Sequence, residues 1–541
     1  PEDLSGNVRV KLRQAREAAL QDSRFGINVG ALESVQPAPL GVEDVYPQVG
    51  ASWIDSATFQ EFLQHLSRDR NARVERLGAS EWRVTGAGFG VASTDECGTL
   101  RRPLGKLFHS LLNMTEIRVT DSDVDGRAIP NPEETAAALE KAEEIREKFQ
   151  DWVFEDPERA SRLLAIYNER FNAIALRDYS AEGQALQLPG LTETFVPHPH
   201  QRAAVARIIA EPTVGLFHEV GAGKTAEMVI GTMELRRLGF VTKPVVVVPN
   251  HMLEQFSREW LQLYPSARIL AADVTDVTRE NRRKFVARAV TNPWDAIIMT
   301  RTAFQRIPVS DAWQDTYSQR EGVVQSSYLD RAVESGAMTI KEAENARAKL
   351  EATINDTTPL VRDVGVATFE QMGIDYLVVD EMHDFKGLPI GSKLKGANLP
   401  TPSKRAADMH MKIELLRATS ESGRVATVAT ATPLSNTVVE AYTMQRFLRP
   451  DLLEEVGVHD FEAWAATFGE LHTEMEVDVA GGMKTQTRLS RFKNLPEMLR
   501  MWRVAGDVKT AADLNLPTPE LALNSKGQAR PEMVIVPASP A

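Results

Sequence analysis

Short runs of apolar residues alternate, between residues 191 and 300, with segments whose apolar positions recur at helical spacing. The runs rich in Val and Ile are 213–217, 244–249, 267–273 and 295–300, and two more follow at 374–380 and 424–430. Such alternation is typical of βαβ units, in which helices cover both faces of a parallel sheet. The pattern therefore predicts an α/β domain with a parallel sheet over residues 191–450.

The first 190 residues carry a mixed pattern, which predicts a separate α/β accessory domain at 1–190. Its clearest element is a helix capped by Asn131, because Asn is a favoured N-cap, Pro132 suits the first helical position and Glu134 the third. A second helix is predicted after Asp156. No catalytic constellation stands out here.

Two other segments depart from the strand pattern. Residues 305–370 are polar and helical in character, which predicts a helical insertion that projects from the sheet domain. Beyond residue 450 the pattern is irregular and helical until a last apolar run at 533–537. We therefore expect 451–541 to be a helical segment and a linker.

Composition narrows the class of protein. The 541 residues are 43% hydrophobic and 25% charged, values of a soluble globular chain, and no apolar run approaches the ~20 residues of a membrane-spanning helix. The only cysteine, Cys97, excludes a disulfide framework and a cysteine-based zinc site and fits a reducing cytoplasm. The net charge of −13 argues against a protein that coats nucleic acid but leaves room for a local basic track.

The segment 215–225 carries the most specific chemistry. An apolar strand runs into a turn and a helix start formed by Gly221, Ala222, Gly223, Lys224 and Thr225. A turn of this kind points backbone N–H groups and a helix N-terminus at one spot and so forms an anion site. Lys224 would contact the β- and γ-phosphates and Thr225 would ligate Mg²⁺. Because His218 stands where the strict motif has Gly, a glycine turn without a ligand is the alternative.

Two acidic residues end the apolar run 374–380. Asp380 and Glu381 would lie at the carboxyl end of a buried strand, where open α/β sheets bind ligands. Asp380 can hold Mg²⁺ through water, and Glu381 can orient and deprotonate an attacking water. An acidic strand end that caps the next helix is the alternative, but a phosphate loop in the same predicted sheet favours a nucleotide site.

Two polar positions complete the candidate site. Thr430 and Thr432 follow the next strand, where hydroxyl groups can bond to neighbouring carboxylates and sense hydrolysis; a Thr/Pro turn is the alternative. Gln201 precedes the phosphate-loop strand, and its amide offers the donor and the acceptor that the adenine edge requires. As an isolated residue Gln201 would be a surface glutamine.

Six segments in order resemble motifs Q, I, Ia, Ib, II and III of superfamily-2 helicases, with a spelling closest to Swi/Snf-type DNA translocases. The segments are 197–205, 218–225, 245–260, 296–304, 378–383 and 429–436. The resemblance implies a RecA-like lobe with helices on both faces of its sheet, and ATP and Mg²⁺ as ligands. It implies Gln201 at the adenine, Lys224 and Thr225 at the phosphates and Mg²⁺, and Asp380 and Glu381 at Mg²⁺ and water.

The same resemblance implies contacts with DNA. It places Pro249 and Asn250 of motif Ia, and Thr300 and Arg301 of motif Ib, along the DNA backbone. His218 and Met382 depart from the family spelling without removing a phosphate or metal ligand. Basic residues also gather after motif II, interspersed with few acids: Lys386, Lys393, Lys395, Lys404, Arg405, Lys412, Arg417 and Arg424. This stretch predicts a phosphate track that includes Lys404 and Arg405, with a solvated loop and helix face as the alternative.

Further segments, among them 4–12, 30–37, 131–154 and 504–519, resemble large phage- and plasmid-borne methylase–helicase proteins, some of them linked to defence or anti-restriction. The likeness implies a fragment of a longer polypeptide with a methyltransferase domain. The nearest candidate for a methyltransferase loop, 292–295, lacks the second proline and is interpreted as a simple loop. Motifs IV to VI of a second RecA-like lobe are not recognised after Asn436. An arginine finger from that lobe contributes about 10³–10⁵ in rate, so we expect weak hydrolysis by this chain alone.

The sequence thus predicts the ATP-binding motor lobe of a Swi/Snf-like DNA helicase or translocase. Its expected partners are duplex DNA, a second RecA-like lobe and a methyltransferase domain. The alternative is a nucleotide-gated module that binds DNA or protein without efficient turnover.

Overall fold

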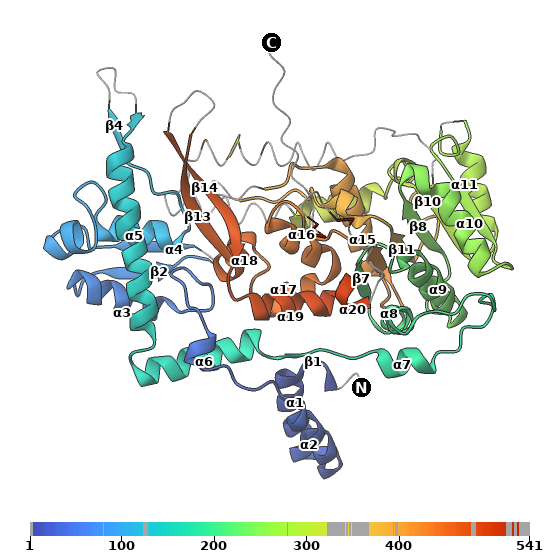
Figure 1. Ribbon diagram of the computed structural model, residues 1–541, viewed down its shortest axis with the longest axis horizontal. Coiled ribbons are helices and arrows are strands. Elements are labelled where there is room, and N and C mark those ends of the chain that lie inside the picture. The colour runs from blue at the N-terminus through green and yellow to red at the C-terminus, as the bar shows by residue number, and fades with distance from the viewer. Residues whose placement is uncertain are drawn as a thin grey trace.

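The computed structural model describes residues 4–78, 81–122, 128–278, 280–321, 367–392, 399–477 and 483–514, with a few single residues and short stretches besides. Figure 1 shows the helices between residues 56 and 153 at one end of the molecule and the sheet domain at the other, with the first two helices below the middle. The helices and the hairpin that follow residue 438 lie between these two parts in that view.

A seven-stranded sheet, parallel throughout, forms the centre of the sheet domain. Its strands, in order across the sheet, are β15 (Gly506–Lys509), β7 (Thr213–His218), β12 (Ala426–Ala429), β11 (Tyr376–Val379), β8 (Pro244–Val248), β10 (Ala296–Thr300) and β9 (Ile269–Ala272). All strands predicted from the apolar runs are present, so the predicted α/β fold with a parallel sheet is confirmed.

Alternate residues of the strands enter two separate hydrophobic clusters, because successive side chains of a strand point to opposite faces. Val245 and Val247 of β8 pack on one face, whereas Val246 and Val248 pack on the other. The helices that contribute to the second cluster are α8 (Pro199–Ala210), α9 (Lys224–Arg237) and α10 (Leu253–Leu263). The helices that contribute to the first include α11 (Arg282–Thr291), α12 (Arg301–Phe304), α15 (Lys404–Thr419) and α16 (Val439–Leu448).

The N-terminal region is mostly helical, with short two-stranded pairings. Its helices are α1 (Val8–Gln21), α2 (Gly26–Ser34), α3 (Ser56–Ser67), α4 (Leu104–Leu112), α5 (Pro132–Val153), α6 (Pro157–Phe171) and α7 (Ser180–Ala185). The paired strands are β1 (Gly6–Asn7) with β6 (Ile174–Ala175), β2 (Arg73–Arg76) with β3 (Trp82–Thr85), and β4 (Thr120–Ser122) with β5 (Ala128–Pro130). The predicted cap of α5 is confirmed, because Asn131 Oδ1 accepts from the N–H of Glu134 at 3.0 Å, and Asp156 caps α6 in the same way.

The segment after residue 450 contains more than the predicted helices. Its elements are α17 (Pro450–Glu455), α18 (Phe461–Phe468), the hairpin β13 (Gly469–Val477) and β14 (Met483–Phe492), α19 (Leu495–Ala505), β15 and α20 (Ala511–Leu514). β15 joins the main sheet beside β7, although no strand was predicted there. Its four residues include Asp507 and Lys509 around a single aliphatic residue, Val508, so no apolar run marks it.

Several predictions fall on residues outside those that the structure describes. Most of the insertion at 305–370 is among them, although residues 311–321 are helical. The apolar run 533–537 and the basic residues Lys393 and Lys395 also lie outside the described residues. Within the described part of the chain, no helix combines the length and the apolar character that crossing a membrane requires.

Candidate nucleotide-binding site

The phosphate loop connects the end of β7 to the start of α9. Gly221 and Gly223 adopt positive φ angles of 86° and 84°, which favour glycine. A Cβ at Gly223 would lie 2.3 Å from Nε2 of Gln201, so a side chain there would displace the Gln201 amide. Gly223 is the N-cap of α9, and Lys224 and Thr225 are the first residues of that helix. The loop therefore faces the N-terminus of a helix, whose first N–H groups have no partner within the helix.

Lys224 lies between the loop and the acidic residues of motif II. Its Nζ donates to the carbonyl oxygens of His218 at 2.9 Å and Glu219 at 3.1 Å. Burial lowers the pKa of Lys224, while Glu381 and other nearby carboxylates act in the opposite direction. The ammonium group is thus within electrostatic reach of Asp380 and Glu381, as a phosphate contact between the two motifs requires.

Gln201 is buried in the first turn of α8 and holds the phosphate loop. Its Oε1 accepts from the N–H of His198 at 2.9 Å, and its Nε2 donates to the carbonyl of Ala222 at 3.2 Å. Nε2 of His200 lies 3.0 Å from the same carbonyl. Both ends of the Gln201 amide bond to protein groups in this structure, so adenine would have to replace at least one of these bonds. The adenine contact stays a prediction.

Asp380 and Glu381 follow β11 directly, at the carboxyl end of the sheet. Asp380 is buried, and burial followed by the charge of Glu381 raises the pKa of Asp380 to about 6. Glu381 adopts a left-handed backbone conformation with φ of 55°, which is uncommon for a residue with a side chain. Its side chain is 39% exposed, so the two carboxylates differ in their access to water.

His383 connects motif II to motif III, a role that we did not predict. Its Nδ1 lies 2.9 Å from Oε2 of Glu381 and 3.1 Å from Oγ1 of Thr430. Thr430 is buried, and its Oγ1 also accepts from the N–H of Thr432, an exposed residue, at 3.1 Å. The threonine hydroxyl and the Glu381 carboxylate therefore both contact the same imidazole nitrogen. His383 lies in the segment 378–383, so its place in motif II was the sequence signal that could have pointed to this role.

Asp380, Glu381 and Thr225 are the groups that would hold a magnesium ion at this site. The two carboxylates are adjacent in the chain, and burial first and the charge of Glu381 second raise the pKa of Asp380 to about 6. No group of three or more His, Cys, Asp or Glu residues in the described part of the chain forms a cage of its own. Mg²⁺ needs no such cage in phosphoryl-transfer sites, where one or two carboxylates share it with phosphate oxygens and waters.

The residues predicted to follow DNA lie at the ends of β8 and β10. Asn250 is exposed, and its Oδ1 accepts from Oγ1 of Thr302 at 3.3 Å. Pro249 and Thr300 are buried, and Thr300 caps α12. Arg301 pairs with Asp384 and is only 12% exposed. Of these predicted contacts, Asn250 has the most accessible side chain.

The basic residues after motif II do not form one continuous surface. Lys412 is fully buried and donates to Asp408 at 2.8 Å, and Lys386 is buried against Glu440 at 2.9 Å. The predicted track is therefore wrong for Lys386 and Lys412, because α15 and the motif II segment turn these positions into the core.

The other described basic residues of this stretch also differ in their surroundings. Arg417 donates to Glu414 and to the carbonyl of Phe447, and Arg424 donates to the carbonyl of Ile209. Lys404 is exposed and Arg405 is half-buried at the start of α15. Burial lowers the pKa of Arg301, and Arg405 lowers it further, so these two arginines are close.

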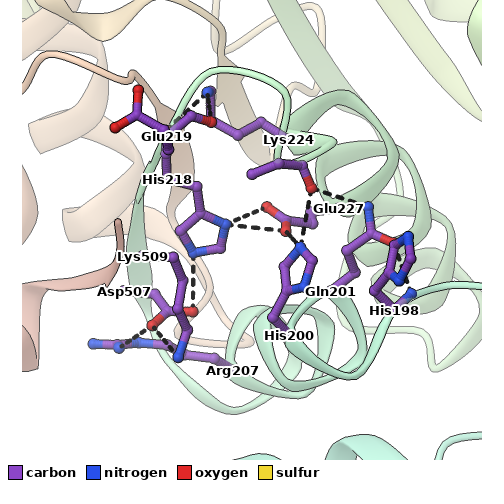
Figure 2. A network of polar contacts seen from close by, with 11 residues as sticks. His198, His200, Gln201, Arg207, His218, Glu219, Lys224, Glu227, Asp507 and Lys509 are labelled. Atoms are coloured by element: carbon purple, nitrogen blue, oxygen red, sulfur yellow. Dashed lines mark hydrogen bonds and ion pairs between the residues drawn. The ribbon is translucent and has the colours of Figure 1, made fainter. Parts of the chain in front are cut away.

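His218 forms a buried ionic network that the sequence did not reveal. Its Nδ1 lies 3.0 Å from Glu227 of α9, and its Nε2 lies 3.1 Å from Asp507 of β15. Figure 2 shows the imidazole between the two carboxylates, directly below the loop that carries Lys224. His218, which stands where the strict motif has Gly, thus connects β7, α9 and β15.

Two protein families match parts of this chain. A family described as "Probable helicase domain" matches residues 211–510, and a "Domain of unknown function (DUF8437)" matches residues 48–173. Defense against restriction protein B of Escherichia phage P1 is 24% identical over 424 residues, which cover 70% of this chain and 18% of the phage protein. The chain thus spans less than a fifth of that relative.

Two solved structures of the Sulfolobus solfataricus SWI2/SNF2 ATPase core, with and without dsDNA, align at 13% and 14% identity. The alignments cover 62% of this chain and 48% of each Sulfolobus chain, with TM-scores of 0.33 and 0.31.

The match to the helicase-domain family includes the phosphate loop, motifs II and III and β15, and it extends over more than half of the residues. The resemblance to a helicase lobe is therefore confirmed, and the chain belongs to the family described as "Probable helicase domain".

Proposed function

We propose that the chain is the ATP-binding motor lobe of a superfamily-2, Swi/Snf-like DNA helicase or translocase. One observation carries the proposal: Lys224, Asp380 and Glu381 meet at the carboxyl edge of one parallel sheet, within electrostatic reach of each other. Ligands bind at this edge in open α/β sheets. Membership in the helicase-domain family supports the same function.

Each side chain has a role that its position supports. Lys224 neutralises charge on the β- and γ-phosphates after it leaves the carbonyls of His218 and Glu219. Thr225 and Asp380 would hold Mg²⁺, which would supply positive charge to the phosphate oxygens. Glu381 orients the attacking water and accepts its proton, and His383 positions the Glu381 carboxylate at 2.9 Å.

The proposed nucleic-acid partner is duplex DNA, and the contacts proposed for it are Pro249, Asn250, Thr300, Arg301, Lys404 and Arg405. The exposure of Asn250 after β8 and of Lys404 at the start of α15 supports these two contacts. A second RecA-like lobe would supply an arginine finger, which contributes about 10³–10⁵ in rate. We therefore expect slow hydrolysis without that lobe. The methyltransferase partner rests on the resemblance alone.

Nucleotide binding and turnover test the proposal separately. Titration with a fluorescent ATP analogue and Mg²⁺ should show saturable binding that Lys224→Ala weakens strongly. ATPase rates with and without duplex DNA then test the motor function. ATP-dependent DNA affinity without measurable turnover, even with a second lobe added, would instead support a nucleotide-gated binding module. Failure to bind ATP would contradict both functions.

A further inference from the structure

The phosphate loop is attached to the protein on two sides. On one side, His200 and Gln201 of α8 contact the carbonyl of Ala222. On the other side lies β15, a strand outside all the helicase motifs. The N–H of Glu219 donates to the carbonyl of Lys509 at 2.9 Å, which continues the pairing of β15 with β7 into the loop.

The side-chain contact between β15 and the loop is ionic. His218 and Glu227 are completely buried, and Asp507 is 17% exposed. An imidazole that bonds to a carboxylate through each nitrogen satisfies both only when both nitrogens carry a proton. Burial opposes this charge, but the hydrogen bonds to Asp507 and Glu227 outweigh it and raise the pKa of His218 to about 9. His218 is therefore an imidazolium at neutral pH.

Titratable and charged groups of α8 and β15 also face this network. His200 of α8 has its ring centroid 6.2 Å from that of His218 and lies 3.8 Å from Glu227. Arg207 of α8 and Lys509 of β15 each lie 4.0 Å from Asp507. Arg207 and Lys509 partly balance the negative charge of Asp507. The strongest contact of the Asp507 carboxylate is the hydrogen bond with His218 (Figure 2).

The network bears on Lys224 through the backbone. The carbonyls of His218 and Glu219 hold the Lys224 ammonium, and β15 holds the same two residues, one by its side chain and one by its N–H. A shift of β15 would therefore move both carbonyl oxygens relative to the rest of the loop. Glu227 alone would still hold His218 to α9, but it does not reach β15.

We propose that Asp507 is a positioning residue of the nucleotide site: through His218 it fixes the phosphate loop, so that the docking of β15 sets the affinity for ATP. This inference rests on the proposed ATP-binding function and adds a means of control to it. Any movement of the chain after α19 that displaces β15 would then change the loop, with no contact to the nucleotide itself.

Two variants separate charge from shape. Asp507→Asn keeps the size of the side chain and an acceptor but removes the charge, whereas Asp507→Glu keeps the charge. Binding of the fluorescent ATP analogue should weaken by roughly tenfold in Asp507→Asn, as expected for substitutions along a coupled network, and Asp507→Glu should recover most of the affinity. The matched control is Asp513→Asn, an exposed residue of the same segment that caps Thr510.

The pH profile adds a readout that a purely structural role would not move. In the wild type, affinity should fall as the pH rises through about 9, where His218 loses its charge. In Asp507→Asn the midpoint should move down by about one pH unit, because an opposite charge has been removed. His218→Gln should bind weakly and lack this transition, which separates it from the titration of Lys224.

The possible outcomes separate the role of Asp507 from the proposed ATP-binding function. Wild-type affinity and midpoint in a folded Asp507→Asn protein would overturn the role of Asp507, while the ATP-binding function would stand if Lys224→Ala still weakens binding strongly. Loss of folding in both Asp507→Asn and His218→Gln would also overturn it, because the network would then serve the fold and not the loop. If the wild type binds no ATP, the proposed function itself is wrong.

Discussion

The two halves of the candidate site differ in charge balance. Around the phosphate loop, the imidazolium of His218 lies between Glu227 and Asp507, and the pKa of Asp507 is held low by that bond despite burial. Around motif II, two carboxylates lie together and the pKa of Asp380 is raised to about 6. In the loop half a cation already lies between the two carboxylates, whereas in the acidic half the proposed Mg²⁺ would balance them. We therefore propose that the first half holds the loop in place and that the second acts on the nucleotide.

The acidic half can be tested at its exposed member. Glu381→Gln removes the proton acceptor and should reduce single-turnover ATP hydrolysis by about 10³-fold, measured by quenched flow or by radiolabelled phosphate release. Binding of ATP should persist, because the loop half is unchanged. Glu421→Gln, at an exposed position, is the control. A Glu381→Gln protein with wild-type turnover would remove the chemical role from this half.

The loop half should leave a signature in stability. His218 has a folded pKa of about 9 against an ordinary value of 6.5, so its contribution is fully present below pH 6.5 and is lost as the pH rises through about 9. The shift corresponds to about 3 kcal/mol. Urea unfolding from pH 6 to 10 should show this loss in the wild type and in the exposed-residue control His251→Gln. The loss should be absent in His218→Gln.

Lys224 belongs to both halves, because it bonds to loop carbonyls and lies near the motif II carboxylates. Lys224→Ala should weaken ATP binding by about 10²-fold, since charge-assisted hydrogen bonds to phosphate are lost. Equilibrium titration with the fluorescent analogue measures the change. Lys243→Ala, at the opposite end of β8, should leave affinity intact. Equal effects of both substitutions would mean that general charge, and not the loop, governs binding.

The smallest expected effect concerns the link from motif II to motif III. His383→Ala removes the group between Glu381 and Thr430 and should slow hydrolysis by about tenfold, within the range for general acid–base machinery and its support. ATP affinity should change little. Thr432→Ala leaves the Thr430 hydroxyl in place and serves as the comparison. A larger loss in Thr432→Ala than in His383→Ala would contradict the link.

The central strands and the phosphate loop were predictable because their signals are local. β8 and β11 are buried on both faces, so their sequences are continuous apolar runs. The loop needs glycines at positive φ, and those glycines appear in the sequence next to Lys224. β15 escaped prediction because an edge strand is only partly buried and its side chains are polar. The basic stretch was predicted wrongly as a continuous track because the charge of a residue does not show which way its side chain points. Lys412, for example, lies on the buried side of α15.

The class of fold, the phosphate loop and the acidic pair could be predicted because each depends on residues close together in the chain. The distant groups that contact these residues became known from the folded structure. It placed Asp507 on His218 across 289 positions and Thr430 on His383 across 47. The reason is physical: strand order across the sheet sets these contacts, and that order arises from packing of the whole domain and not from any local pattern.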